Sequence, residues 1–136
     1  MPNRVQWEPA FAVGDALIDA QHQGLLNRCN SLADLCPAEG ETQPDRLFDL
    51  AFEGLKALVR EHFEAEATWF TSRGDLDLED HRAECDEFEY LAGEIATAEN
   101  FSRLELQRFV AVWCVGHILD TAERQRALLA DGNTPA

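Results

Sequence analysis

Four stretches of the chain repeat apolar residues at intervals of three and four, the spacing that places them on one face of an α-helix. They cover residues 15–36, 44–70, 78–98 and 103–129, and none shows the alternation of a half-buried strand. Amphipathic helices joined by short loops bury their apolar faces by packing side by side in alternating directions. The pattern therefore predicts an all-α fold, an antiparallel up-down-up-down four-helix bundle.

The residues between these stretches are of the kinds that end or begin helices. Pro37 cannot continue the first stretch, Gly74 can supply a positive φ after the second, and Ser102 is a good N-cap for the fourth. The first dozen residues carry no helical pattern. They are predicted to form an irregular N-terminal arm, with Trp7 and Phe11 packed on the bundle.

The chain of 136 residues has the length of one ordinary domain, so residues 1–136 are interpreted as a single domain. Its formal net charge of −15 argues against nucleic acid and against anionic membrane surfaces, because both attract basic residues. No apolar run approaches the roughly 18 residues of a membrane span, and the N-terminus lacks the pattern of a secretory signal. We therefore expect a cytoplasmic protein whose four cysteines, which form no CxxC pair, are thiols.

The histidines lie on the apolar faces, one in each predicted helix: His22, His62, His81 and His117. If about three in seven helix positions face inward, the probability of this by chance is roughly 3%. In an antiparallel bundle the first three fall near one end, and His117 can reach the same level. A single inward histidine is more often a hydrogen-bonded core residue, but four that converge are costly in a dry interior unless a metal ion or hydrogen bonds satisfy them.

Glu66 strengthens the interpretation as a metal site. It lies one turn after His62 on the same face, so both side chains can bind one ion, whereas Glu64 points elsewhere and is interpreted as a solvated glutamate. Imidazole and carboxylate ligands suit iron, manganese or zinc. Several histidines with one carboxylate and an open position favour iron and a small bound molecule, although the ligand types alone leave zinc open.

Four short motifs surround these residues. They are W-x3-F-x-V-G-x3-I-D-x2-H from Trp7 to His22, H-F-x2-E from His62 to Glu66, H-x3-C-x2-F from His81 to Phe88, and W-x3-H-I from Trp113 to Ile118. Together they resemble the hemerythrins, and the bacterial members in particular, over nearly the whole length of the chain.

The resemblance implies a four-helix bundle with two irons bridged by a glutamate and an aspartate, five histidines completing the site, and reversible oxygen binding at an open position. The residues that match ligand positions are His22, His62, Glu66, His81 and His117. Two positions depart from the family pattern. Cys85 stands where the family has a further histidine, and Ala122 stands where it has the bridging aspartate.

Because alanine offers no donor atom, we interpret the site as reduced, and one non-haem iron is favoured over two. The four histidines and Glu66 are its predicted ligands. Cys85 is a further candidate as a thiolate, since metals lower the pKa of a thiol, or it is a bystander. Asp120 is a weaker substitute for the missing carboxylate because its angle on the helix differs.

The favoured function is a non-enzymatic iron protein that binds or senses oxygen or another diatomic gas such as nitric oxide, because a single iron cannot deliver two electrons to oxygen. Three alternatives stay open: a di-iron oxygen carrier or store, a mononuclear-iron enzyme that reduces superoxide or peroxide if Cys85 ligates, and a metal-free scaffold. The acidic run from Glu84 to Glu89 is interpreted as a solvated face rather than a docking patch. The sequence identifies no protein partner.

Overall fold

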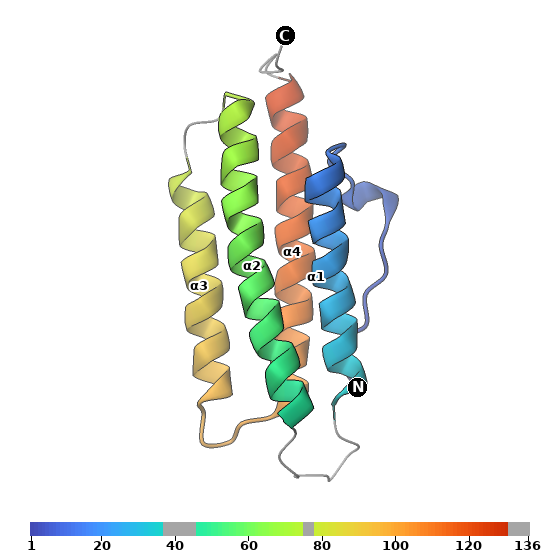
Figure 1. The fold of residues 1–136 in the computed structure, drawn as a ribbon, viewed down its shortest axis with the longest axis vertical. Helices are drawn as coiled ribbons and strands as arrows, with labels where there is room; N and C mark the ends of the chain where they lie inside the picture. Colours follow the sequence, from blue (N-terminus) through green and yellow to red (C-terminus); the bar gives the residue numbers. More distant parts are fainter. Residues whose placement is uncertain (37–45, 75–77, 131–136) are drawn as a thin grey trace.

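The structure is a computed structural model that describes residues 1–36, 46–74 and 78–130. A single turn of 3₁₀-helix, η1 (Pro9–Phe11), precedes four helices: α1 (Ala16–Asp34), α2 (Arg46–Ser72), α3 (Glu79–Ala96) and α4 (Arg103–Ala130). Figure 1 shows the four helices side by side with alternating direction, α2 and α4 each packing against both α1 and α3. The predicted four-helix bundle is confirmed, and the described residues contain no strand.

The helix ends lie where the local signals place them. The side chain of Asp15 accepts a hydrogen bond from the Ile18 N–H at 3.0 Å and caps α1. The Ser102 hydroxyl accepts from the Glu105 N–H at 3.2 Å, and Gly74 has a φ of 88°, so both of these predictions are confirmed. The predicted break at Pro37 and the predicted start of the second helix at residue 44 lie outside the described residues.

The N-terminal arm runs along the bundle beside α1 (Figure 1). Its backbone is held by two side-chain amides, one from each flanking helix. Gln107 on α4 donates to the Asn3 carbonyl and accepts from the Asn3 N–H, both at 2.7 Å. Asn30 on α1 pairs with Val5 in the same way, at 2.8 and 2.9 Å. The arm is therefore irregular in secondary structure, as predicted, but firmly docked.

The end of the arm also fixes the start of α1. Phe11 is buried, and the Trp7 ring packs against it in an edge-to-face arrangement with the ring centroids 5.6 Å apart. The predicted packing of both aromatics is confirmed. The backbone then turns at Gly14, whose φ of 88° suits glycine. The Asp19 carboxylate accepts from the Val13 and Gly14 N–H groups at 2.8 and 3.3 Å, which ties this turn to the first turns of α1.

Two apolar clusters fill the interior. The larger extends from Leu32 and Phe48 up to Phe63 and Ile118. The smaller consists of Val13, Ile18, Trp69, Phe70 and Ala122. Along α1, Ile18 belongs to the smaller cluster and Leu25 to the larger, with His22 between them. The bundle thus carries a polar layer enclosed between two apolar ones. None of the described helices is long and apolar enough to span a bilayer.

Candidate metal centre

The polar layer is built from one or two residues of every helix. α1 contributes His22, α2 contributes His62 and Glu66, α3 contributes His81 and α4 contributes His117, and each is at most 5% exposed. Burial of this kind makes an unpaired polar atom costly, and within the layer His22 Nδ1 is buried without a hydrogen-bond partner. The helices that bring these side chains together come from all parts of the sequence, so the layer exists only in the folded chain.

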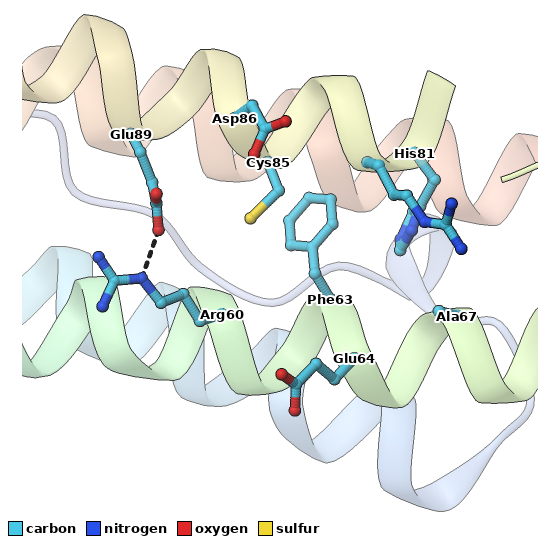
Figure 2. Close-up of a pocket in the computed structure, with 9 residues that line it drawn as sticks. Arg60, Phe63, Glu64, Ala67, His81, Cys85, Asp86 and Glu89 are labelled. Carbon is cyan, nitrogen blue, oxygen red and sulfur yellow. Dashed lines mark hydrogen bonds and ion pairs between the residues drawn. The ribbon is translucent and has the colours of Figure 1, made fainter. Parts of the chain in front are cut away.

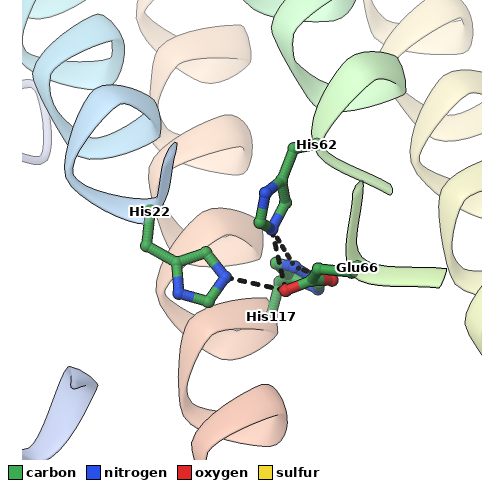
Figure 3. Close-up of side chains that lie close together, drawn as sticks. All are labelled: His22, His62, Glu66 and His117. Atoms are coloured by element: carbon green, nitrogen blue, oxygen red, sulfur yellow. Dashed lines mark hydrogen bonds and ion pairs between the residues drawn. The ribbon is translucent and has the colours of Figure 1, made fainter. Parts of the chain in front are cut away.

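Glu66 lies at the centre of the layer, and its two oxygens divide the histidines between them. Oε2 lies 2.9 Å from His22 Nε2 and 2.8 Å from His62 Nε2, while Oε1 lies 3.0 Å from both His81 Nε2 and His117 Nε2. Figure 3 shows His22, His62 and His117 converging on this carboxylate from three helices. One donor atom from each of these four residues lies within 4.8 Å of the others. His81 joins them through its contact with Oε1.

Two further side chains hold the outer nitrogens of two imidazoles. His62 Nδ1 donates to Gln21 Oε1 at 2.7 Å, and His117 Nδ1 donates to Glu84 Oε1 at 2.8 Å. A carboxylate can only accept, so the bond to Glu84 fixes a proton on His117 Nδ1. With Nδ1 protonated, the lone pair of a neutral imidazole lies on Nε2 and faces the centre of the layer.

Aromatic rings fix the orientation of His117. The Trp113 ring, one turn earlier on α4, stacks on the imidazole with an interplanar angle of 4° and a centroid distance of 5.4 Å. Phe63 from α2 covers the His117 ring at a centroid distance of 4.7 Å and the His81 ring at 4.6 Å.

The Thr121 hydroxyl lies 3.2 Å from Glu66 Oε2 and 3.0 Å from the His117 carbonyl oxygen, and its single hydrogen can be donated to either acceptor.

The charges in the layer follow from these contacts. Burial raises the pKa of Glu66, but the charge of His117 and hydrogen bonds from His117 and His22 outweigh burial and hold this pKa well below its usual range. Burial lowers the pKa of His117, but Glu66 and Glu84 overcome this and raise it to about 9. For His62 burial prevails, and the pKa is lowered. Near neutral pH the layer therefore holds a carboxylate, a protonated His117 and a neutral His62.

This donor set fits a metal ion. Neutral His62 donates through Nδ1 to Gln21, so its Nε2 lone pair faces Glu66 Oε2 at 2.8 Å and His117 Nε2 at 3.2 Å. A lone pair facing a carboxylate oxygen at this distance is repulsive unless a proton or a cation lies between them. Imidazole nitrogen and carboxylate oxygen together suit divalent transition ions. The five residues would hold such an ion through Nε2 atoms and the Glu66 oxygens.

Cys85 is the one predicted ligand that the structure does not bring into the layer. It is half-buried and lines a cleft of about 450 Å³ between α2 and α3, together with Arg60, Phe63, His81, Arg82 and Glu89. Figure 2 shows its sulfur pointing from α3 toward α2, beside the Phe63 ring. Burial, reinforced by nearby Glu89 and Asp86, raises the pKa of Cys85 to about 11. In the metal-free protein it is a neutral thiol at neutral pH.

The two other positions at which a second carboxylate was considered also lie outside the layer. Ala122 is 1% exposed and packs in the smaller apolar cluster beside Phe70. Asp120 is exposed on the outer face of α4, so it does not take the place of an inward carboxylate. Glu66 is thus the single acidic residue among the fully buried side chains of the described chain.

Sequence reasoning missed the residues behind the histidines. The interpretation of the acidic run as a solvated face holds for Asp86 and Glu87, which are exposed. It is wrong for Glu84, which is half-buried and bonded to His117, because α3 turns this position toward α4. The sequence offered one signal for these two residues, which is that each lies close to a histidine: Glu84 is three residues after His81, and Gln21 directly precedes His22. The spacing does not reveal that their hydrogen bonds go to histidines on other helices, His117 and His62.

A buried layer of four imidazoles and one carboxylate, with α2 contributing both a histidine and the glutamate, defines a metal-binding four-helix-bundle protein. Comparison with known families identifies the family to which it belongs. Residues 13–124 match the Hemerythrin HHE cation binding domain, and the chain belongs to this hemerythrin family. It is similar to a myohemerythrin of Theromyzon tessulatum, with 30% identity over 122 residues that cover 89% of this chain and 90% of the relative. No solved structure matches the chain.

Proposed function

We propose that this protein binds non-haem iron in the layer around Glu66 and that the iron binds a diatomic gas, oxygen or nitric oxide, in a non-enzymatic carrying or sensing role. The observation that carries the proposal is the set of imidazole nitrogens directed at one buried carboxylate, with Nδ1 of His62 and His117 committed outward. Membership in a cation-binding family supports the same conclusion. Bound iron would supply an exchangeable coordination position and one-electron redox chemistry.

One iron per chain is favoured over two. A second ion would share Glu66 with the first, since Ala122 contributes no donor and Cys85 lies in the cleft. Two divalent ions beside a single buried carboxylate would leave three uncompensated positive charges in a layer that is almost fully buried, and uncompensated buried charge is strongly unfavourable. A single divalent ion leaves one.

The cleft between α2 and α3 is the approach that we assign to the gas. Among the five predicted ligands His81 is the most exposed, at 5%, and it lines the cleft together with Phe63 and Cys85 (Figure 2). The Phe63 ring and the neutral thiol lie next to His81 and suit a small uncharged molecule there, while charged side chains, Arg60, Arg82 and Glu89 among them, line other parts of the cleft. Phe63 covers both His81 and His117, so it limits the size of what reaches them.

A di-iron oxygen carrier is the second candidate, and one observation favours it. The two oxygens of Glu66 each contact a separate pair of imidazoles, His22 with His62 and His81 with His117. A carboxylate that bridges two ions would divide its ligands in this way. The reductase alternative is less favoured, because it depends on Cys85 as a ligand and that thiol lies outside the layer.

Three further expectations belong to this proposal. The chain functions as a single hemerythrin-like domain, it belongs to the bacterial type within the family, and it acts in the cytoplasm. The family match over residues 13–124 supports the first of these, because it covers most of the chain.

The test is metal analysis of protein grown in iron-rich medium, with nitric oxide added to the reduced protein under anaerobic conditions. We expect one iron per chain and a new absorption band with nitric oxide. Glu66→Ala removes the central carboxylate and should abolish iron binding, whereas Glu64→Ala, an exposed glutamate on the same helix, should not. Two irons per chain would establish the second candidate, and equal iron in wild type and Glu66→Ala would refute the metal centre.

A further inference from the structure

The charge balance of the metal centre does not close with its inner ligands alone. Four neutral imidazoles and the Glu66 carboxylate around a divalent ion leave a net charge of +1 inside a layer whose side chains are at most 5% exposed. A net charge in such surroundings is costly, and proteins compensate it with a nearby opposite charge. A compensating charge acts most strongly when it lies near the ion and little solvent screens the interaction.

Glu84 lies in that place. Its Oε1 accepts the Nδ1 proton of His117 at 2.8 Å, so the carboxylate is connected to the layer through one imidazole ring. Its side chain is 30% exposed, so the carboxylate contacts both the layer and water. No lysine or arginine among the described residues forms an ion pair with Glu84, so no other cation neutralises its charge.

The corresponding position behind His62 is neutral. Gln21 Oε1 accepts the Nδ1 proton of His62 at 2.7 Å, the same contact that Glu84 makes with His117 but from an amide. Both residues orient an imidazole, but only Glu84 also brings a negative charge. The contact of Gln21 with His62 can therefore be compared with that of Glu84 with His117 to separate the effect of charge from that of orientation.

We propose that Glu84 is a positioning residue that supplies, through His117, the second negative charge that the buried metal centre needs. This inference rests on the proposed metal centre and concerns its charge balance. A carboxylate behind a metal-bound imidazole makes the imidazole a stronger donor and lowers the net charge of the site. With Glu66 and Glu84 together, the centre around a divalent ion is neutral.

The test uses Zn²⁺, which has no redox chemistry, in competition with a chromophoric chelator. Glu84→Gln keeps the shape and the hydrogen-bond acceptor but removes the charge, and we expect its affinity for Zn²⁺ to fall by about 10- to 100-fold. The decisive variant is the exchange Glu84→Gln with Gln21→Glu, which returns one carboxylate behind the other imidazole. We expect this double variant to recover most of the lost affinity.

Two controls separate charge from structure. Glu87→Gln removes an equal charge from an exposed position on the same helix and should leave the affinity within about two-fold of wild type, because exposed charges are screened. With iron in place of zinc, Glu84→Gln should raise the midpoint potential, since less negative charge favours the ferrous state. Circular dichroism and thermal melting of each variant establish that it is folded.

Each outcome decides the matter. Equal Zn²⁺ affinity in wild type and Glu84→Gln would overturn the inference, and so would a loss in Glu87→Gln as large as that in Glu84→Gln. A double variant as weak as Glu84→Gln would also overturn it, because one negative charge would then have been returned behind His62 without restoring the affinity. If the wild-type protein itself binds no Zn²⁺ or iron, the failure lies with the proposed metal centre instead.

Discussion

Replacing Ala122 by aspartate tests both the packing of the bundle and the boundary of the metal centre. Ala122 is 1% exposed on α4 and packs in the smaller apolar cluster with Ile18, Trp69 and Phe70. An aspartate there places a carboxyl group among apolar side chains, five residues beyond His117 and on the inner face of the same helix. We expect the metal-free variant to be markedly less stable than the wild type.

The magnitude has two parts. A buried carboxyl group without a full set of partners costs about 1–3 kcal/mol even when it is protonated. The added atoms must also fit into a packed core, which costs about 1–3 kcal/mol more. The sum, roughly 2–6 kcal/mol, is a large share of the 5–15 kcal/mol by which a domain is ordinarily stable.

The measurement is urea unfolding of metal-free protein, followed by circular dichroism, for the wild type, Ala122→Asp and Ala122→Val. Valine adds bulk without polarity, so the difference between the two variants isolates the cost of the buried carboxyl group. In iron or zinc the deficit of Ala122→Asp should shrink if the new carboxylate adds a ligand, because an ion bound more tightly by the variant than by the wild type stabilises the variant more. Iron bound per chain should rise above the wild-type value if the new carboxylate reaches the centre.

Two results would refute this reasoning. A metal-free Ala122→Asp variant within about 0.5 kcal/mol of wild type, the range of ordinary surface changes, would mean that position 122 is not enclosed as described. A destabilised variant whose metal content and metal-induced stabilisation both equal those of the wild type would mean that position 122 faces away from the centre.

Further predictions concern pH, thiol chemistry and the N-terminal arm. Because folding raises the pKa of His117 from 6.5 to about 9, its ion pair with Glu66 should stabilise the metal-free protein fully below pH 6.5 and cease to do so as the pH rises through about 9, measured by urea unfolding across this range. The same proton must leave before a metal binds, so Zn²⁺ affinity should increase up to about pH 9 and then level off. With a pKa raised to about 11, Cys85 should react slowly with iodoacetamide at pH 8 and much faster at pH 10, followed by mass spectrometry of the labelled peptide; a fast reaction at pH 8 would contradict the neutral thiol. Gln107→Leu should lower stability by about 1–3 kcal/mol and speed cleavage of the arm by protease, because the backbone groups of Asn3 lose their partners; an unchanged cleavage rate would contradict the docking by Gln107.

The fold was predictable because each helix carries its own evidence. The apolar spacing within a helix and the residues at its ends, such as Ser102 and Gly74, are local properties of the sequence. The inward histidines were predictable for the same reason, since each occupies an apolar face. Their common level then follows from the alternating direction of the helices. For these features the tertiary structure adds little that the sequence does not already contain.

The outer parts of the site were not predictable in this way. On α3, His81 and Cys85 are four residues apart and share one face by periodicity, yet His81 contacts Glu66 and Cys85 lines the cleft. The rotation of α3 about its axis and its distance from α2 decide whether a side chain reaches Glu66 or the cleft. The spacing of residues in the sequence determines neither of these quantities. Glu84 depends on the same rotation, which turns it toward His117 on a different helix.

The arrangement of the layer also links metal binding to folding. The chain places a His62 lone pair 2.8 Å from a Glu66 oxygen inside an apolar bundle, and His117 Nε2, which can donate a proton to it, lies 3.2 Å away. A bound cation replaces the repulsion by coordination while the helices stay where the apolar clusters hold them. The two apolar clusters therefore position the helices around the polar layer whether or not a cation is bound. It follows that loss of the metal should lower the stability of the bundle without unfolding it. The larger cluster joins residues of all four helices, and the smaller one joins residues of α1, α2, α4 and the N-terminal arm.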